Sequence, residues 1–135
     1  MSSIVSRWPV LVTSSIAGDD LDAGGHLVQA TVRRLGDAVV VALVDASPLL
    51  AAAEHTFAPT SAQLNGSFSG PGPVTVSAGP SEIYPSSFTV NLRIRPADGS
   101  GATVDAVWMV DVPGGVARAL RDELIALNHA AEHAH

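Results

Sequence analysis

Residues 20–45 read DLDAGGHLVQATVRRLGDAVVVALVD, and this stretch decides how the rest of the chain can fold. It opens with aspartates and glycines, which are typical of a turn that leads into a helix. From His26 to about Asp45 apolar residues recur at helical spacing, and Ala38 to Val44 is apolar nearly all round. Such a helix must be buried, so we expect a sheet to cover it.

Segments with the pattern of β-strands flank this helix on both sides. We expect a first strand at Ile4 to Thr13, where β-branched and apolar residues are dense and Pro9 requires an edge or a bulge. After the helix, alternation of polar and apolar residues predicts four more strands. They span Ser61 to Phe68, Val74 to Tyr84, Phe88 to Arg95 and Ala102 to Val112. Gly79-Pro80 should bend the strand that contains it, and the last two strands should form a hairpin.

An amphipathic helix closes the chain from about Val116. Its apolar stripe consists of Val116, Leu120, Leu124 and Leu127, opposite Arg118, Arg121 and Asp122. The order of strand, long apolar helix, four strands and amphipathic helix predicts an α+β fold in which an antiparallel sheet wraps around one buried helix. We expect a single domain over residues 1–135, because this length suffices for one core.

Composition narrows the classes of function. Apolar residues make up 47% of the chain and charged residues 15%, which argues against disorder and favours an oligomer that covers further apolar surface. The net charge of −6 and the absence of basic clusters argue against a nucleic-acid partner. The first twenty residues do not have the pattern of a signal peptide, and no apolar window is long enough to span a membrane. We therefore expect a cytoplasmic protein without a membrane partner.

The segment from Asp20 to His26 is the candidate for chemistry. The N-terminus of a helix has unpaired N–H groups and the positive end of the helix dipole, so an oxyanion beside Gly25 and His26 would be stabilised there. A carboxylate at Asp22 could then act as a nucleophile, or as a base on a water molecule. The alternative is that Asp20 or Asp22 only caps the helix and that the glycines form the preceding turn.

These residues also carry a resemblance to a known family. The pattern D-x-D-x-x-G-H, present as Asp20, Asp22, Gly25 and His26, resembles the motif of hotdog thioesterases related to 4-hydroxybenzoyl-CoA thioesterase. SFSGPGPVTV, SSFTVNLRI, DAVWMVDV and the closing helix are similar to that family in order and spacing. The resemblance implies a hotdog fold, hydrolysis of an acyl-CoA or another acyl thioester, and a site between the subunits of a homodimer or homotetramer.

The resemblance further implies roles for the residues of the motif. Asp22 takes the catalytic position, and the N–H of Gly25 or His26 polarises the thioester carbonyl. Asp20 is a supporting residue. Gln29, which stands where the family typically has Asn, is a second supporting residue.

Three residues outside the motif are candidates for contacts with the substrate. Arg93 or Arg95, on the outward side of the fourth strand, could bind the CoA phosphates. Ser87, at the start of that strand, is a further candidate. We expect Trp108 in the core or in an interface first, and in the wall of an acyl pocket second.

The chain departs from the family pattern just after the motif. Val28 and Gln29 stand where the family typically has two Asn, and Val32 stands where it has Tyr. Polar groups that orient water or substrate are therefore missing. This favours, as the alternative function, a non-catalytic hotdog protein that binds an acyl ligand or a protein partner. The hotdog dehydratases would require a His and an Asp with an intervening Asn-Pro, which is absent here.

The sequence gives no reason to expect a metal ion or a cofactor. Without cysteine there is no thiolate metal site. His129, Glu132 and His133 spell H-x-x-E-H, a pattern of some zinc peptidases, but only two residues follow and leave no room for a further acidic ligand. We expect a fraying helix end at these residues instead.

Overall fold

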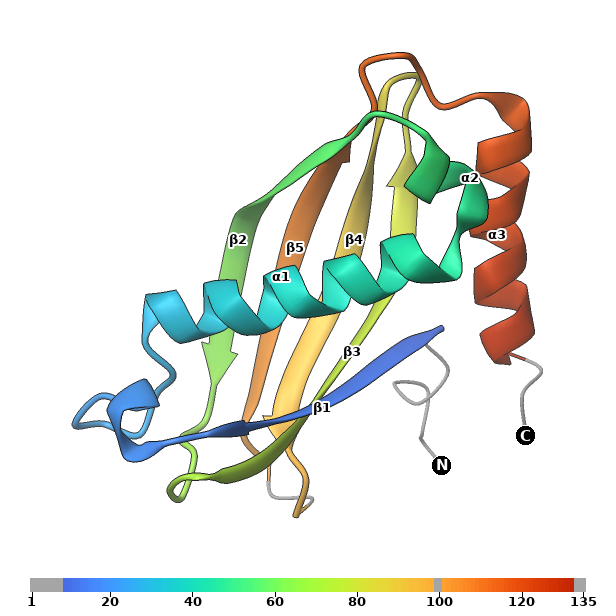
Figure 1. Cartoon of the computed structure of the whole chain (residues 1–135). Coiled ribbons are helices and arrows are strands. Elements are labelled where there is room, and N and C mark those ends of the chain that lie inside the picture. Colours follow the sequence, from blue (N-terminus) through green and yellow to red (C-terminus); the bar gives the residue numbers. More distant parts are fainter. Residues whose placement is uncertain (1–8, 99–100, 133–135) are drawn as a thin grey trace.

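The computed structural model describes residues 9–98 and 101–132, which form a strongly curved sheet with helices (Figure 1). The strands are β1 (Val10–Ile16), β2 (Thr56–Asn65), β3 (Gly72–Ile83), β4 (Ser87–Pro96) and β5 (Thr103–Asp111). The helices are α1 (Gln29–Ala46), α2 (Pro48–Ala52) and α3 (Arg118–Glu132), and a short 3₁₀ turn covers Gly18–Asp20. Across both described ranges, no helix is long and apolar enough to cross a membrane.

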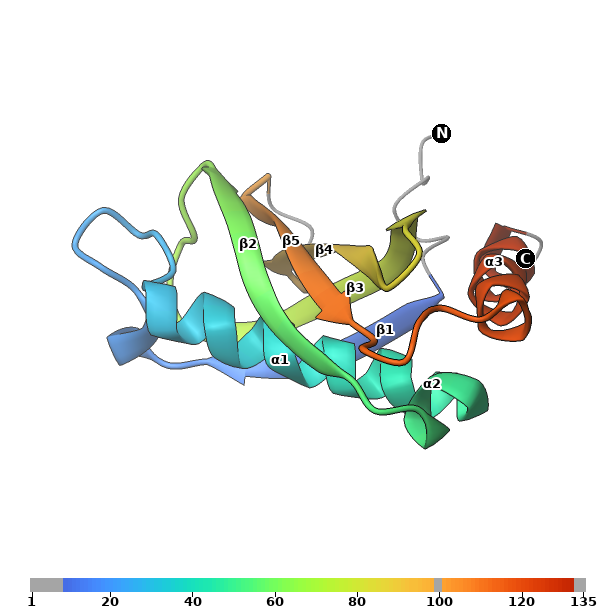
Figure 2. The same cartoon turned by 90° about the horizontal axis from the view of Figure 1, so that it is seen from above.

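The sheet has the strand order β1-β3-β4-β5-β2, and every neighbouring pair is antiparallel. The expected hairpin between the last two strands is confirmed, because β4 and β5 pair from Ser87 with Asp111 to Ile94 with Val104. The expected irregularity near Gly79-Pro80 is also confirmed, by a register shift between Pro80 and Ile83 in β3. Figure 2 shows the strands curving around α1, while α3 lies beyond the C-terminal end of that helix.

The core lies between α1 and the concave face of the sheet. Val39, Val40 and Leu43 of α1 are completely buried, which confirms the buried helix that the sequence predicts. Each such side chain stabilises the fold by about 1.5–3 kcal/mol relative to full exposure. The prediction that Ala38 to Val44 is buried is wrong for Ala38 and for Val41, which is 48% exposed, because both lie on the side of α1 away from the sheet.

The predicted bounds of the first two strands need correction. The first strand was expected at Ile4 to Thr13, but β1 runs from Val10 to Ile16, and residues 4–8 lie outside the described part of the chain. The second was expected at Ser61 to Phe68, but β2 runs from Thr56 to Asn65. Phe68 leaves the strand because its N–H donates to the carbonyl oxygen of Gly25, 2.8 Å away.

The edge strand β2 contains Pro59, which lies before the strand that the sequence predicts from Ser61. Among the described strands, β2 pairs with β5 alone, and a register shift between Pro59 and Ser61 accommodates the proline. The alternation of polar and apolar residues in this segment is typical of a strand with one buried face. In the single chain, however, nearly all residues of β2 are exposed. Leu64, for example, is 42% exposed, because α1 does not extend over this part of the strand.

The helix α1 approaches β5 most closely at Gly36. A β-carbon added at Gly36 would overlap the six-membered ring of Trp108, so the indole occupies the space that a helix side chain would fill. The indole is completely buried, and its Nε1 donates a hydrogen bond to Oδ1 of Asp37, 3.0 Å away. A buried indole N–H needs such a partner, so the contact fixes both the helix and the ring.

Replacement of Gly36 by Ala should therefore destabilise the protein by about 1–3 kcal/mol, the usual cost of overpacking. This sign is opposite to the gain of up to about 1 kcal/mol that Gly→Ala gives inside an ordinary helix. Urea unfolding of Gly36→Ala and of the control Gly18→Ala, which has open space around the added carbon, would measure the difference. A Gly36→Ala variant as stable as the original protein would contradict the close contact.

Candidate active site

The segment between β1 and α1 is a closed loop held by backbone hydrogen bonds. Leu21 and Leu27 form an antiparallel bridge, in which the N–H of Asp22 donates to His26 O and the N–H of Val28 donates to Asp20 O, each over 2.9 Å. This pairing keeps residues 26–28 extended, so α1 begins at Gln29 and not at His26 as the helical spacing predicts. The loop that this bridge closes therefore ends before α1 begins and is not the first turn of the helix.

Gly25 is required by the shape of this loop. Its φ of 82° lies in the left-handed region that favours glycine. A β-carbon at Gly25 would also lie 2.9 Å from the carbonyl oxygen of Phe68. The loop consequently packs against the chain between β2 and β3, two segments far from it in sequence.

The carboxylate of Asp22 is held within its own loop. Oδ1 accepts hydrogen bonds from the N–H groups of Gly24, over 2.8 Å, and His26, over 3.0 Å, and the Nδ1 atom of His26 lies 3.7 Å away. The N–H of His26, followed by that of Gly24, lowers the pKa of Asp22 below its ordinary value of 3.8. The side chain is 53% exposed. Asp22 is thus an ionised and accessible carboxylate at neutral pH.

The N–H groups expected to polarise a carbonyl are already engaged. That of Gly25 donates to Asp22 O over 3.0 Å, and that of His26 donates to the Asp22 carboxylate. Because Thr31 and Val32 both donate to Val28 O, the unpaired donors at the start of α1 belong to the two residues before them. In the described part of the chain, the N–H groups of Gln29 and Ala30 have no acceptor, as is usual for a first helical turn.

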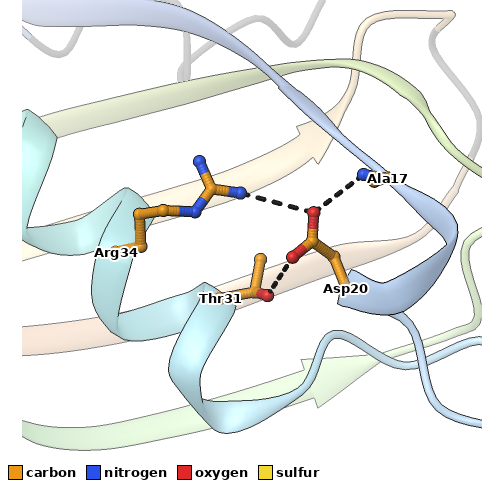
Figure 3. A network of polar contacts seen from close by, with 4 residues as sticks. All are labelled: Ala17, Asp20, Thr31 and Arg34. Atoms are coloured by element: carbon orange, nitrogen blue, oxygen red, sulfur yellow. Dashed lines mark hydrogen bonds and ion pairs between the residues drawn. The ribbon is translucent and has the colours of Figure 1, made fainter.

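Asp20 ties the end of β1 to α1 (Figure 3). Its Oδ1 accepts from the Thr31 hydroxyl over 2.6 Å, and its Oδ2 accepts from the Ala17 N–H over 2.7 Å and from Arg34 over 3.4 Å. The Thr31 hydroxyl, then the Ala17 N–H, and last the charge of Arg34 lower the pKa of Asp20 below 3.8. Asp20 therefore positions the loop relative to the helix, while its supporting role in catalysis stays a prediction.

A pocket of about 470 Å³ opens between the first turns of α1 and the middle of β2. Its wall is mostly apolar, and the residues come from α1, β2 and β5. They are Gln29, Ala30, Val32, Arg33, Pro59, Thr60, Ser61, Ala62 and Trp108. The two residues with unpaired N–H groups, Gln29 and Ala30, are therefore part of this wall.

Sequence reasoning identified only part of this pocket. It named Gln29 as a supporting residue and weighed Trp108 as a pocket wall, but it missed Ala30 and Arg33. The sequence signal that could have indicated this pocket is Gly36, because a glycine inside a helical pattern often marks a place where another part of the chain packs closely against the helix. That the partner of Gly36 is Trp108 depends on the tertiary fold and could not be predicted from the sequence.

The three residues expected to bind the substrate lie elsewhere in the chain. Arg93 donates through Nε to Asp105, on the face of the sheet opposite α1, and Arg95 is exposed on that same face. Ser87 is the first residue of β4 and pairs with Asp111, at the end of the sheet where β2 begins. Within residues 9–98 and 101–132, no contact joins them to Asp22 or to the pocket. Their role stays a prediction.

The described residues include no group of three His, Cys, Asp or Glu side chains placed to hold a metal ion. The H-x-x-E-H pattern at His129, Glu132 and His133 lies outside this statement, because the structure does not describe the side chains of residues 129–132 or any part of residue 133.

No protein-family model matches the sequence, and no curated protein matches it. Among solved structures, the chain is similar to a thioesterase-superfamily protein from Jannaschia sp. CCS1, with a TM-score of 0.70, 12% identity, and 90% of this chain and 84% of that chain covered. The chain has the hotdog fold. The α+β prediction, with a sheet wrapped around a central helix, is therefore confirmed.

Two further solved structures are similar to this chain. A thioesterase from Thermus thermophilus, complexed with coenzyme A and Zn, has a TM-score of 0.63 and 20% identity, with 91% of this chain and 96% of that chain covered. A 1,4-dihydroxy-2-naphthoyl-CoA thioesterase from Synechocystis has a TM-score of 0.53 and 9% identity, with 76% and 80% covered. At these identities the similarity is one of fold.

The network around Asp20 makes a prediction for Thr31→Val, which removes the hydroxyl and keeps the shape. The pKa of Asp20 should rise toward 3.8, because this hydroxyl is the largest cause of its lowering. A lowered pKa stabilises the folded state above the pKa of the unfolded chain, and that stabilisation is lost as the pH falls through the folded value. Thr31→Val should therefore destabilise the protein at pH 7, and the difference should shrink as the pH falls below 3.8.

Carboxyl NMR titration and urea unfolding at several pH values would test this prediction. Asp22 is the internal control, since its partners lie in its own loop and its titration should not change. An unchanged pKa of Asp20 in the variant would refute the assigned cause.

Proposed function

We propose that the protein hydrolyses an acyl-CoA, or another acyl thioester, to a free acid and a thiol. One observation carries the proposal: Gln29 and Ala30, whose N–H groups are unpaired, line a mostly apolar pocket, and the ionised carboxylate of Asp22 lies in the loop that leads into the same helix. An acyl chain requires an apolar pocket, and its thioester carbonyl requires hydrogen-bond donors. The fold that this chain shares with thioesterases supports the same activity.

In the proposed reaction the thioester carbonyl oxygen accepts hydrogen bonds from the N–H groups of Gln29 and Ala30. Asp22 then takes a proton from a water molecule, whose oxygen attacks the carbonyl carbon. The resulting oxyanion is stabilised by the positive end of the α1 dipole. When the carbon–sulfur bond breaks, its electron pair leaves with the thiolate, which takes up the proton from Asp22.

A direct attack by Asp22 on the carbonyl carbon would use the same groups. The carbon–sulfur bond would then break, which expels the thiolate and leaves a mixed anhydride between Asp22 and the acyl group. Water would hydrolyse this anhydride, releasing the acid and restoring the Asp22 carboxylate. In both routes Asp22 must be ionised, and its lowered pKa ensures this at neutral pH.

We further propose that the site is completed in a homodimer or homotetramer in the cytoplasm. The edge of β2 has no neighbouring strand in the sheet, and Leu64 on that strand is exposed. Val41 adds exposed apolar surface on α1. A second copy of the chain would bury such surface and close the open side of the pocket. Arg93, Arg95 and Ser87 are proposed contacts to CoA in that assembly.

Acyl-ligand binding without turnover is the second candidate function. The observation that favours it is the way in which Asp22 accepts the N–H groups of Gly24 and His26. A carboxylate in such a turn also has a structural role, which could be kept after the loss of catalysis.

Replacement of Asp22 by Asn should reduce thiol release from acyl-CoA by about 10²-fold or more, because an amide neither accepts the proton nor attacks the carbonyl. Thiol release from short, long and aromatic acyl-CoAs would be measured with a colorimetric thiol reagent. Asp19→Asn is the matched control, since Asp19 is exposed just before the loop and has the same chemistry.

Full activity of Asp22→Asn on this panel would rule out the catalytic role. If the unaltered protein releases no thiol from any acyl-CoA but is stabilised thermally by one of them, the second candidate function is correct.

A further inference from the structure

The proposed hydrolysis leaves one charged group of the pocket without a role. Arg33 lies one helical turn, about 5.4 Å, along α1 from Gln29. Of the nine residues that line the pocket, it is the only charged one. The described residues that form the rest of the wall are apolar or carry neutral polar groups. A single positive charge beside a mostly apolar cavity suggests a ligand that is apolar in part and negatively charged at one end.

The side chain of Arg33 is held in place by a chain of two hydrogen bonds. Trp108 Nε1 donates to Oδ1 of Asp37 over 3.0 Å, and Arg33 Nε donates to Oδ2 of the same carboxylate over 3.2 Å. Trp108 is fully buried and locked beneath Gly36, so Asp37 is fixed from the core outward. The guanidinium group is therefore oriented by the fold and not only by its own helix.

The terminal nitrogens of Arg33 remain available for a ligand. Within residues 9–98 and 101–132, its hydrogen bonds end at Asp37, which contacts Nε only. The other N–H groups of a guanidinium form a planar fork that fits a carboxylate bidentately. The side chain of Arg33 is 55% exposed, so this fork is accessible.

We propose that Arg33 selects acyl groups with a carboxylate at the end remote from the thioester, such as a glutaryl group. This inference rests on the proposed thioester hydrolysis, because the carbonyl at Gln29 and Ala30 places the far end of a short acyl chain near the next turn of α1. Arg33 is then a specificity-determining residue that contacts the substrate. Asp37 and Trp108 are positioning residues that act through Arg33.

The test compares glutaryl-CoA with valeryl-CoA, two thioesters with acyl chains of equal carbon number that differ in the terminal carboxylate. The unaltered protein should show a kcat/KM for glutaryl-CoA about 10- to 100-fold higher, the ratio expected from hydrogen bonds to a charged group. Arg33→Met should abolish this ratio, because kcat/KM should fall much more for glutaryl-CoA than for valeryl-CoA, and Arg33→Lys should restore part of it. Arg118→Met, on the exposed side of α3, is the matched control and should keep the full ratio.

The positioning residues are tested by the same ratio. Asp37→Asn and Trp108→Phe should each lower the preference for glutaryl-CoA, mainly through a rise in KM that is larger for glutaryl-CoA than for valeryl-CoA. A purely structural role would reduce the hydrolysis of both thioesters together, which would contradict the positioning role.

Calorimetric titration of both thioesters separates this inference from the proposed function. If neither thioester is hydrolysed but glutaryl-CoA binds more tightly in a manner that depends on Arg33, hydrolysis is refuted and the selectivity is supported. Equal kcat/KM and equal Kd for the two thioesters overturn the inference, even if both are hydrolysed. An equal loss for both in Arg33→Met also overturns it, since Arg33 would then bind the CoA moiety. Failure of both to bind overturns both proposals.

Discussion

The packing of α1 onto the concave face of the sheet is the constraint on which the other features depend. Gly36 lets the helix backbone approach β5 until the indole of Trp108 takes the place of a helix side chain. This contact sets the height of α1 above the sheet, and thereby the width of the gap between its first turns and β2. The same buried indole donates a hydrogen bond to Asp37, so a core residue holds a carboxylate at the surface in place.

The two aspartates of the loop, Asp20 and Asp22, differ in which parts of the chain they contact. Asp20 contacts Ala17, the residue after β1, and Thr31 and Arg34 of α1, so it connects the end of β1 to the first turns of the helix. The contacts of Asp22 lie within its loop, and half of its side chain faces outward. A carboxylate that shapes its own loop needs no support from the helix to keep its position. The loop can therefore present Asp22 in the same way whether or not catalysis is required.

The sequence predicts the order of the elements well, because hydrophobic periodicity indicates which residues are buried, and α1 and the sheet bury their apolar residues against each other. It fails where long-range pairing overrides the local pattern. His26 to Val28 read as helix, but the bridge between Leu21 and Leu27 keeps them extended. Pro59 reads as loop, but the edge position and a register shift admit it to β2. Asp22 could be found from its motif, whereas the meeting of Arg33, Asp37 and Trp108 requires residues 71 positions apart to come together.

The irregular middle of β2 has a consequence for how this protein resists aggregation. An exposed edge strand is a template for any other extended chain. Here Pro59 offers no N–H, the register shifts before Ser61, and the Thr60 hydroxyl turns back to donate to Val107 O over 3.0 Å. A straight foreign strand cannot follow this edge along its whole length. The missing N–H and the register shift therefore make β2 a poor template for an unrelated extended chain.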